Sequence, residues 1–415
     1  MPPLAYYFST FPALSETLVR SQVEATEDLG LPFLLVANRR PQPRDLLPGD
    51  LPLIERTHYL TPVRPVAYLK ANGRLLTNSH GRYGQAFKEA WRLARHSPRQ
   101  LAFNLCHLAG AVYLKGSLEA HQVRHVHVHY AFGAGDVALF LDKLSSIPYS
   151  LSIHGSDVLL ENPLLEGKLA GARFVVSNCR YHIRHLRQRF PSLKRQRFYL
   201  VRGGVDLAAP LWSWVRPAQT PSPLRLLNVA RLAPVKGQDM LLRACSHLTR
   251  QGVAWECRLV GEGPERHRLE HLIKTLGLEG RVSLLGAQSQ AEVARLYDWA
   301  QVVVLSSRSE GTPMTVIEAM AKARPVVAPQ ITALPEMVLD GVTGWLCRPG
   351  DALDLAAKIE TFSAKPQLIE DMGEAGRQRA QEFFDLVPNA QTFLNILAQE
   401  VPALGRQPET KVPHV

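Results

Sequence analysis

The sequence of 415 residues is poor in cysteine and has no long apolar run. Its few cysteines form no Cys-x-x-Cys pair, which argues against a disulfide framework and a zinc site and fits a reducing cytosol; they are Cys106, Cys179, Cys245, Cys257 and Cys347. No stretch reaches the ~18 apolar residues of a membrane span, and the first residues lack a basic segment followed by an apolar run. We therefore expect a cytoplasmic protein whose only membrane contact would be peripheral, on the inner face of the cytoplasmic membrane.

Acidic residues are scarce in the first half of the chain. Residues 1–205 contain 26 Lys and Arg against 14 Asp and Glu, whereas residues 206–415 contain 22 against 23. The runs Arg64–Arg99 and Arg180–Arg202 concentrate the excess, and Glu89 is their only acid. Such a field favours anionic partners, namely lipid headgroups, nucleic acid or an acceptor with a pyrophosphate. A merely solvated basic face is the alternative.

Short β-branched runs alternate with longer helix-period segments along the whole chain, which predicts parallel sheets flanked by helices. The predicted strands are 32–37, 124–130, 149–153, 173–177, 224–230, 255–260, 282–285 and 301–305. The predicted helices are 15–30, 85–96, 135–145, 181–189, 238–251, 265–276, 290–299, 353–363, 367–384 and 387–399. Because residues 206–223 are rich in Pro and Trp without periodicity, we expect a linker there between two α/β domains that face a cleft.

The segment Ser306–Pro329 places two carboxylates, a helix start and a strand in one short unit. Thr312 is predicted as the N-cap and Pro313 as the first helical residue, so the free amides of 314–316 would point outward and bind an anion. Glu310 and Glu318, with seven residues between them, would accept hydrogen bonds from hydroxyls. Phosphates and hydroxyls together indicate a nucleotide sugar. A capped surface helix with solvated glutamates is the alternative.

Two loops that follow predicted strands of the second half suit a diphosphate. Arg231 and Lys236 provide a guanidinium fork and a flexible ammonium ahead of Gly237, and such cations complement phosphate oxygens. Gly261 and Gly263 would let the backbone pass close to a nucleotide. Taken alone, the first loop is equally a basic surface loop and the second an ordinary turn.

Histidines gather near the ends of two predicted strands of the first half. His154, followed by Gly155, would approach a ligand at the carboxyl end of its strand, where open parallel sheets bind ligands. Three more, His125, His127 and His129, alternate and so share one face. Because no carboxylate or cysteine completes a metal site, we expect them to line a cleft floor or to pack in the core.

With these residues in place, the sequence resembles family 4 glycosyltransferases, which are retaining enzymes of the GT-B fold, and especially their exopolysaccharide and colanic-acid-type members. The motifs that show the resemblance are TFPALSETLV, HVHVHYAFG, SIHGSD, VRGGVD, NVARLAPVKG, LVGEGPE, SEGTPMTVIEAMAKARPVV and LPEMVLDGVTGWL. They cover nearly the whole chain in order.

The resemblance implies two Rossmann-like doubly wound domains that face each other across a cleft, with C-terminal helices packing back toward the first. Residues 1–205 would bind the acceptor and 224–385 the nucleotide sugar, followed by a helix at 386–400 and a flexible tail at 401–415. The implied catalytic residues are Glu310, His154, Arg231 and Lys236. The implied donor-binding residues are Arg231, Lys236, Gly261, Gly263, Glu310, Gly311, Met314, Thr315, Val316 and Glu318. On the acceptor side the resemblance implies Ser15, Glu16, His129 and Asp157, and it implies no metal or other cofactor.

The sequence departs from the family pattern at three places. Ala323 and Ala333 stand where many relatives have glycine, and we expect packing differences only. The glycine-rich loop that many relatives have after the first strand is replaced by the stretch Ser9–Glu16.

We therefore expect a hexosyltransferase for a saccharide acceptor, most simply one linked to polyprenyl diphosphate at the membrane. Residues Gln85–Leu114 combine basic and apolar positions, as interfacial helices do. A nucleotide-sugar epimerase or a phosphorylase of the same fold is the first alternative. A basic nucleic-acid-binding protein is another, although aromatic residues are not interleaved with its basic runs.

Overall fold

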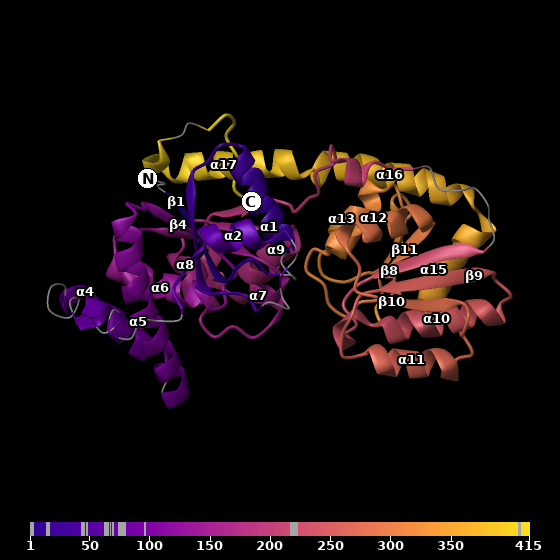
Figure 1. Cartoon of the computed structure of the whole chain (residues 1–415), viewed down its shortest axis with the longest axis horizontal. Helices are drawn as coiled ribbons and strands as arrows, with labels where there is room; N and C mark the ends of the chain where they lie inside the picture. Colours follow the sequence, from indigo (N-terminus) through magenta and orange to yellow (C-terminus); the bar gives the residue numbers. More distant parts are fainter. Residues whose placement is uncertain are drawn as a thin grey trace. The chain divides into compact units, whose positions relative to one another are not determined.

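The structure is a computed structural model that describes residues 4–13, 17–42, 46, 49–61, 66, 68, 70–73, 80–94, 97–215, 223–405 and 408–415. The chain divides into two compact units, the first formed by Met1–Val201 with Ala390–Val415 and the second by Arg202–Asn389. Figure 1 shows both as α/β units. Within the described ranges, no helix is both long and apolar enough to cross a bilayer.

The first unit is built on a parallel sheet in the order β3-β2-β1-β4-β5-β6-β7. The strands at its centre are buried on both faces, as is usual for a parallel sheet covered by helices. The strands are β1 (Leu4–Thr10), β2 (Phe33–Arg39), β3 (His58–Tyr59), β4 (His125–His129), β5 (Tyr149–Ile153), β6 (Val175–Ser177) and β7 (Phe198–Leu200).

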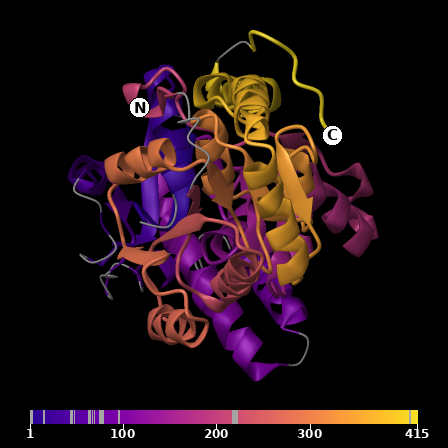
Figure 2. The same cartoon turned by 90° about the vertical axis from the view of Figure 1, so that its right-hand side faces the viewer.

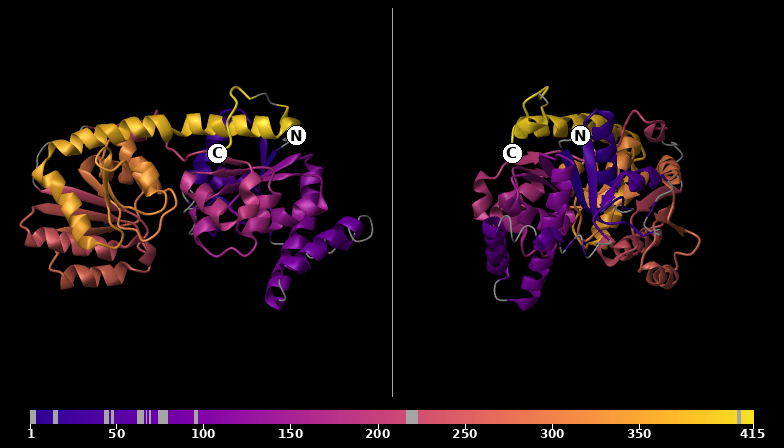
Figure 3. Two further views of the ribbon diagram at one scale, coloured as in Figure 1. Left: turned by 180° about the vertical axis from the view of Figure 1, so that it is seen from behind. Right: turned by 60° about the vertical axis from the view of Figure 1, so that its left-hand side comes forward.

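Helices cover both faces of this sheet. One core lies beneath α4, α5, α6, α8 and α9, and the other beneath α1, α2 and the C-terminal helix α17. Figure 3 shows α4 and α5 side by side, extending away from the sheet. The helices are α1 (Thr17–Asp28), α2 (Leu51–Arg56), α4 (His80–Leu93), α5 (Pro98–Ala120), α6 (Ala134–Leu144), α7 (Gly155–Leu159), α8 (Leu165–Gly171) and α9 (Arg180–Arg189), and a 3-10 turn, η2 (Pro191–Arg195), follows.

The second unit has a parallel sheet in the order β10-β9-β8-β11-β12-β13. Figure 2, with this unit toward the viewer, shows helices on both sides of the sheet. One core lies under α10, α11 and α15, and the other under α12, α13 and α16. The strands are β8 (Leu224–Val229), β9 (Trp255–Val260), β10 (Val282–Gly286), β11 (Val302–Val304), β12 (Val326–Pro329) and β13 (Gly344–Cys347). The helices of this unit are α10 (Gln238–Arg250), α11 (Arg266–Thr275), α12 (Gln290–Trp299), α13 (Met314–Ala321), α14 (Leu334–Met337), α15 (Ala352–Ala364) and α16 (Gln367–Phe383), with short 3-10 turns η3 (Pro210–Trp212) and η4 (Pro234–Lys236). Helix α17 (Leu386–Glu400) and the 3-10 turn η5 (Pro402–Leu404) follow, and from Ala390 onward the chain belongs to the first unit.

The end of the chain packs on the first unit, as the C-terminal helices were expected to do. Phe393 of α17 lies 4.7 Å from the His127 ring between centroids. The expectation of a flexible tail at 401–415 is not met in its described part, since the Val415 N–H donates to the Phe198 carbonyl at 2.7 Å. Val412 also packs against the core of this unit, so burial and a hydrogen bond hold the end of the chain.

The described part of the expected linker, residues 206–215, packs on the second unit. Trp212 is buried in the core of that unit. Carbonyls of this stretch accept hydrogen bonds from three cationic side chains: Lys322 to Ser213 at 2.7 Å, Arg324 to Val215 at 2.9 Å and Arg377 to Trp212 at 3.0 Å. Residues 206–215, whose sequence has no helix or strand period, therefore have an irregular backbone that is well packed on the second unit.

Candidate functional site

The order of the second sheet creates a switch point between β8 and β11, where the chain direction across the sheet reverses. In such sheets, ligands bind outside the carboxyl ends of the strands at this point. The loop after β8 contains Arg231 and Lys236, and the loop after β11 contains Glu310 and leads into α13. Residues 74 positions apart in the chain therefore meet at one edge of the sheet.

A partly buried ion pair joins the two loops. The Lys236 ammonium contacts Glu310 Oε1 at 2.7 Å, and the two side chains are 24% and 7% exposed. Ser307 Oγ donates to the same oxygen at 2.6 Å, and Thr332 Oγ1 donates to the Glu310 carbonyl at 2.6 Å. Among the described residues, Glu310 Oε2 has no hydrogen-bond donor. One oxygen is thus fixed by two donors while the other is available for a ligand.

Close backbone contact between the same loops requires a glycine at position 237. Gly237 has φ +61°, and a Cβ there would lie 2.2 Å from the Ser306 carbonyl oxygen. The neighbouring Arg231 is exposed, and its guanidinium makes no ion pair within the part of the chain that the structure describes. Arg231 therefore presents its charge to solvent beside the Lys236–Glu310 pair.

The start of α13 differs slightly from the prediction. Pro313 is the N-cap and Met314 the first helical residue, one position later than expected. The Val316 N–H donates to the Pro313 carbonyl at 3.1 Å, so the expected free amide at Val316 is wrong. Met314 and Thr315 occupy the first two helical positions, whose N–H groups have no acceptor within a helix. The Thr315 hydroxyl donates to the Val229 carbonyl at 2.8 Å, which holds the helix start against the end of β8.

Glu318 lies within α13 and is held by an aromatic hydroxyl. Tyr297 Oη donates to Glu318 Oε2 at 2.8 Å, and Tyr297 is fully buried. Burial raises the pKa of Glu318, and the hydrogen bond from Tyr297 lowers it in part. A carboxylate that has lost much of its hydration and keeps a fixed donor is preorganised to accept hydrogen bonds from hydroxyls.

Backbone conformation and close packing explain why glycine occupies positions 261 and 263. Their φ angles are +133° and +157°, and a Cβ would lie 2.1 Å from the Ala230 carbonyl oxygen and 2.2 Å from that of Leu232. They therefore let the loop after β9 pack on the loop that contains Arg231. Their approach to a nucleotide stays a prediction, as does that of Gly311, which directly follows Glu310 in the chain.

In the first unit, the predicted acceptor-side residues lie deeper than expected. Asp157 is fully buried, and its carboxylate accepts the N–H of Ala131 at 2.8 Å and that of His154 at 2.9 Å. Burial raises the pKa of Asp157 to about 6. The expectation that Asp157 contacts an acceptor is therefore corrected. Its carboxylate instead joins the loop after β4 to the loop after β5 through these two hydrogen bonds. Ser15 and Glu16 lie outside the described residues.

His129 is likewise buried, with its ring between those of Phe8 and His154 at centroid distances of 5.3 and 5.9 Å. This placement corrects the acceptor-side role and confirms the alternative that these histidines pack in the core. Ser150 and Ser152 bond His127 at 2.8 and 2.9 Å. We call the buried imidazoles of this region the histidine cluster; they are His125, His127, His129, His154 and His182.

His154 stays a candidate ligand contact at the end of β5. It is 9% exposed, and its Nε2 has no partner among the described residues. Burial, followed by the nearby His182, lowers its pKa to about 3, so its imidazole is neutral at physiological pH. Within the described ranges, no group of three His, Cys, Asp or Glu side chains is arranged to hold a metal ion.

Sequence reasoning missed the residues that fix the carboxylates. Ser307 lies three positions before Glu310, a spacing that offers a weak signal. Tyr297 and Thr332 are each more than 20 positions from the glutamate they contact. Their roles follow from the packing of α12 and of the loop after β12, which no local pattern reveals.

Two parallel doubly wound sheets of this kind form the GT-B fold, which solved glycosyltransferase structures share. Residues 216–379 match the family model described as glycosyl transferases group 1. The match lies within the second half of the chain.

The chain is also similar to named glycosyltransferases and to a solved structure. A protein assigned as the colanic acid biosynthesis glycosyltransferase WcaL of Escherichia coli K12 is 35% identical over 219 residues, which are 51% of this chain and 52% of that relative. The match thus spans about half the length of WcaL. The amylovoran biosynthesis glycosyltransferase AmsK of Erwinia amylovora is 28% identical over 416 residues, covering 92% of this chain and 96% of the relative. HepE of Anabaena in complex with UDP and glucose has a TM-score of 0.66 and 19% identity over 96% of this chain and 100% of that one, which shows the shared fold.

Proposed function

We propose that the protein is a retaining glycosyltransferase that moves a hexose from a nucleotide-diphosphate sugar to a hydroxyl of a saccharide acceptor in exopolysaccharide synthesis. The Lys236–Glu310 pair at the switch point is the observation that carries the proposal, because it sets a cation and a carboxylate beside Arg231 and the start of α13. The names of WcaL and AmsK, which refer to polysaccharide biosynthesis, support the pathway class. The UDP and glucose bound to HepE support the donor class.

The cations would act on the leaving group. Arg231 and Lys236 would bind the donor diphosphate and stabilise the charge that develops on it as the glycosidic bond breaks. The first amides of α13 would assist from the positive end of the helix dipole. These fixed positive groups supply the charge stabilisation that a divalent ion provides in other enzymes, so we propose that no metal is needed.

The carboxylates would orient the sugar and the ribose. Glu310 Oε2 would accept a hydroxyl of the transferred hexose, while Oε1 stays bound to Lys236 and Ser307. Glu318 would accept the ribose hydroxyls. Because two donors hold the Glu310 carboxylate, it is a poor nucleophile, and we favour attack by the acceptor on the face that the diphosphate leaves. The departing phosphate would then take the acceptor proton.

Substitution of the cations tests this reading. Arg231→Ala and Lys236→Ala should each lower turnover about 10²- to 10³-fold, the usual loss when one group that stabilises transition-state charge is removed. Both side chains are at least partly exposed, so the variants should fold. Lys274→Ala, at the last turn of α11, is the matched control. Near-normal transfer by both purified variants would refute the assignment.

A thermal-shift panel would identify the donor. UDP, GDP, ADP and their common sugars should differ, and the true donor should raise the Tm of the wild type more than that of Lys236→Ala. If no nucleotide shifts the wild type, the proposed donor class is wrong.

We also propose that the acceptor is lipid-linked and that α4 lies against an anionic membrane. Phe87 and Trp91 lie four positions apart on α4 and are 41% and 60% exposed, with the exposed Lys88 between them. Apolar rings beside a cation suit a headgroup region. Flotation with anionic liposomes should recover the wild type but little of a Phe87→Ser, Trp91→Ser variant; no flotation of the wild type at low salt would remove the membrane claim.

A further inference from the structure

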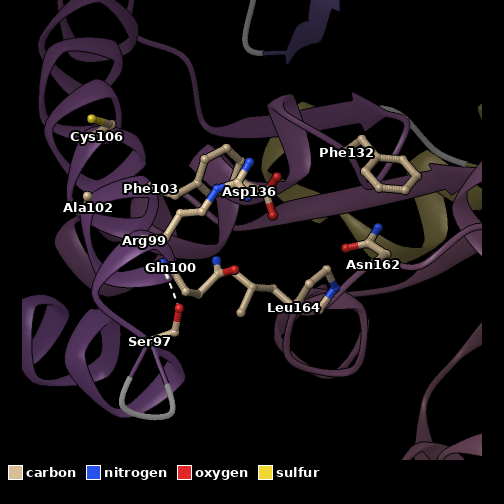
Figure 4. A pocket seen from close by; sticks show the side chains of 11 residues that line it. Ser97, Arg99, Gln100, Ala102, Phe103, Cys106, Phe132, Asp136, Asn162 and Leu164 are labelled. Atoms are coloured by element: carbon tan, nitrogen blue, oxygen red, sulfur yellow. Dashed lines mark hydrogen bonds between the residues drawn. The ribbon is translucent and has the colours of Figure 1, made fainter.

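A cavity in the first unit belongs to no part of the proposed donor site. It has a volume of about 570 Å³ and lies between the first turns of α5, the start of α6 and the segment before α8. Figure 4 shows Arg99 and Phe103 of α5 across from Asp136 and Asn162. Cavities of roughly 300–1,000 Å³ hold small ligands.

The walls of the cavity are mainly apolar. Phe103, Phe132 and Leu164 line it, and Phe103 is 50% exposed although it faces the hollow. An aromatic ring left half in water beside a cavity is a surface that an apolar ligand would cover. The ligand therefore has an apolar part.

The floor is charged but internally neutralised. Lys168 Nζ bonds Asp136 Oδ1 at 2.6 Å and Asn162 Oδ1 at 2.5 Å, and all three side chains are buried. The other Asp136 oxygen accepts the Gly133 N–H at 2.9 Å. Asp136 is thus already paired and is unsuited to bind a cationic ligand.

Two donors remain for a polar head. Asn162 is 6% exposed, lines the cavity, and its buried Nδ2 has no partner among the described residues. Arg99 is exposed at the rim, in the first turn of α5, and makes no ion pair within the described ranges. A guanidinium, an amide N–H and the positive end of a 23-residue helix together favour an anion.

We propose that this cavity binds an amphipathic phosphate ester with one apolar chain. The chain would lie against Phe103, Phe132 and Leu164, and the phosphate would bind Arg99 at the rim with Asn162 Nδ2 as a second donor. The site is separate from the donor site of the second unit. The proposal for this cavity therefore does not depend on the proposed transfer reaction.

Calorimetric titration of the full chain tests the proposal, with octyl phosphate as the probe and octanol and inorganic phosphate as partial probes. Octyl phosphate should bind with one site per chain, and each partial probe should bind at least tenfold more weakly. Arg99→Gln should weaken octyl phosphate binding about tenfold, the loss expected for one charge-assisted hydrogen bond. Phe103→Ser should also weaken it.

Arg124→Gln is the matched control, because Arg124 is an exposed arginine of the same unit at the opposite end of β4 from Phe132. It should bind octyl phosphate as the wild type does, and all variants should keep nucleotide binding and the wild-type circular dichroism. Equal affinity for octanol and octyl phosphate, or wild-type affinity in Arg99→Gln, would overturn the proposal. Binding to phosphatidylglycerol vesicles without binding to octyl phosphate would also overturn it, since a membrane surface would then be the occupant.

Discussion

Removal of the Tyr297 hydroxyl should selectively weaken recognition of ribose. Tyr297, a fully buried residue of α12, donates its Oη hydrogen to Glu318 Oε2 at 2.8 Å. A hydrogen bond to a charged group contributes about 1.5–3 kcal/mol, and about 1.4 kcal/mol corresponds to a tenfold change in affinity. In Tyr297→Phe the carboxylate loses its fixed orientation, and its pKa, already raised by burial, should rise further. We expect about tenfold weaker binding of the nucleoside diphosphate.

The assay compares that nucleotide with its 2′,3′-dideoxy analogue by calorimetry. The wild type should prefer the ribose form, whereas Tyr297→Phe should lose most of this preference and bind the analogue as the wild type does. The loss should grow as the pH is lowered, because a protonated Glu318 accepts hydroxyls poorly. Tyr181→Phe is the control, since the Tyr181 hydroxyl has no hydrogen bond among the described residues. Equal weakening for both nucleotides would show that Tyr297 only supports the fold, and no weakening would refute the role of Glu318.

Three further outcomes are expected. Glu310→Gln should lower the transfer rate about 10²-fold or more and leave the nucleotide affinity nearly unchanged, whereas the main effect of Glu318→Gln should be weaker nucleotide binding. Rates are measured kinetically and affinities by calorimetry. If Glu310→Gln weakened nucleotide binding and Glu318→Gln lowered only the rate, the two roles would be exchanged. Ala323→Gly should raise the Tm by about 2–4 °C, because Ala323 has φ +51° and a left-handed alanine costs roughly 1 kcal/mol. Ala333 has φ −87°, so Ala333→Gly should not raise the Tm. In scanning calorimetry, acidification below the usual histidine pKa of 6.5 should destabilise the first unit. Burial keeps the histidine cluster neutral in the folded state, and it lowers the pKa to about 3 for His125 and His154 and to about 4 for His182. The unfolded chain therefore binds more protons in this pH range. The free energy of unfolding then falls by up to about 1.4 kcal/mol per pH unit for each imidazole. Asp157, with a pKa raised to about 6, opposes this trend below that value, and a Tm that rises on acidification would contradict the expectation.

The departure from the family pattern at position 323 concerns the backbone conformation and not only the packing. The sequence marked position 323 as a departure from the family pattern, and we expected a packing difference. The structure shows a left-handed backbone there, so the difference is one of backbone strain. Ala333 has an ordinary helical backbone, and the two departures are therefore not equivalent.

Local patterns predicted many of the elements but not all of them. The strands 149–153 and 255–260 and the helix 290–299 coincide with β5, β9 and α12, because each has a clear period and a boundary residue. The first strand, β1, was missed, although it lies at the centre of its sheet. Its residues from Leu4 through Phe8 are uninterruptedly apolar and buried on both faces, so it lacks the alternation that identifies a strand.

The sequence by itself determined which residues follow which strands, and hence that Arg231, Lys236 and Glu310 would share one edge of a parallel sheet. Only the tertiary structure decided which atoms meet: the Lys236–Glu310 pair, the Ser307 bond that fixes it, and the Tyr297 bond to Glu318. It also moved His129 and Asp157 from the expected ligand surface into the interior. The physical reason is that strand order and loop position follow from periodicity along the chain, whereas burial and hydrogen-bond partners depend on side chains that come from distant elements.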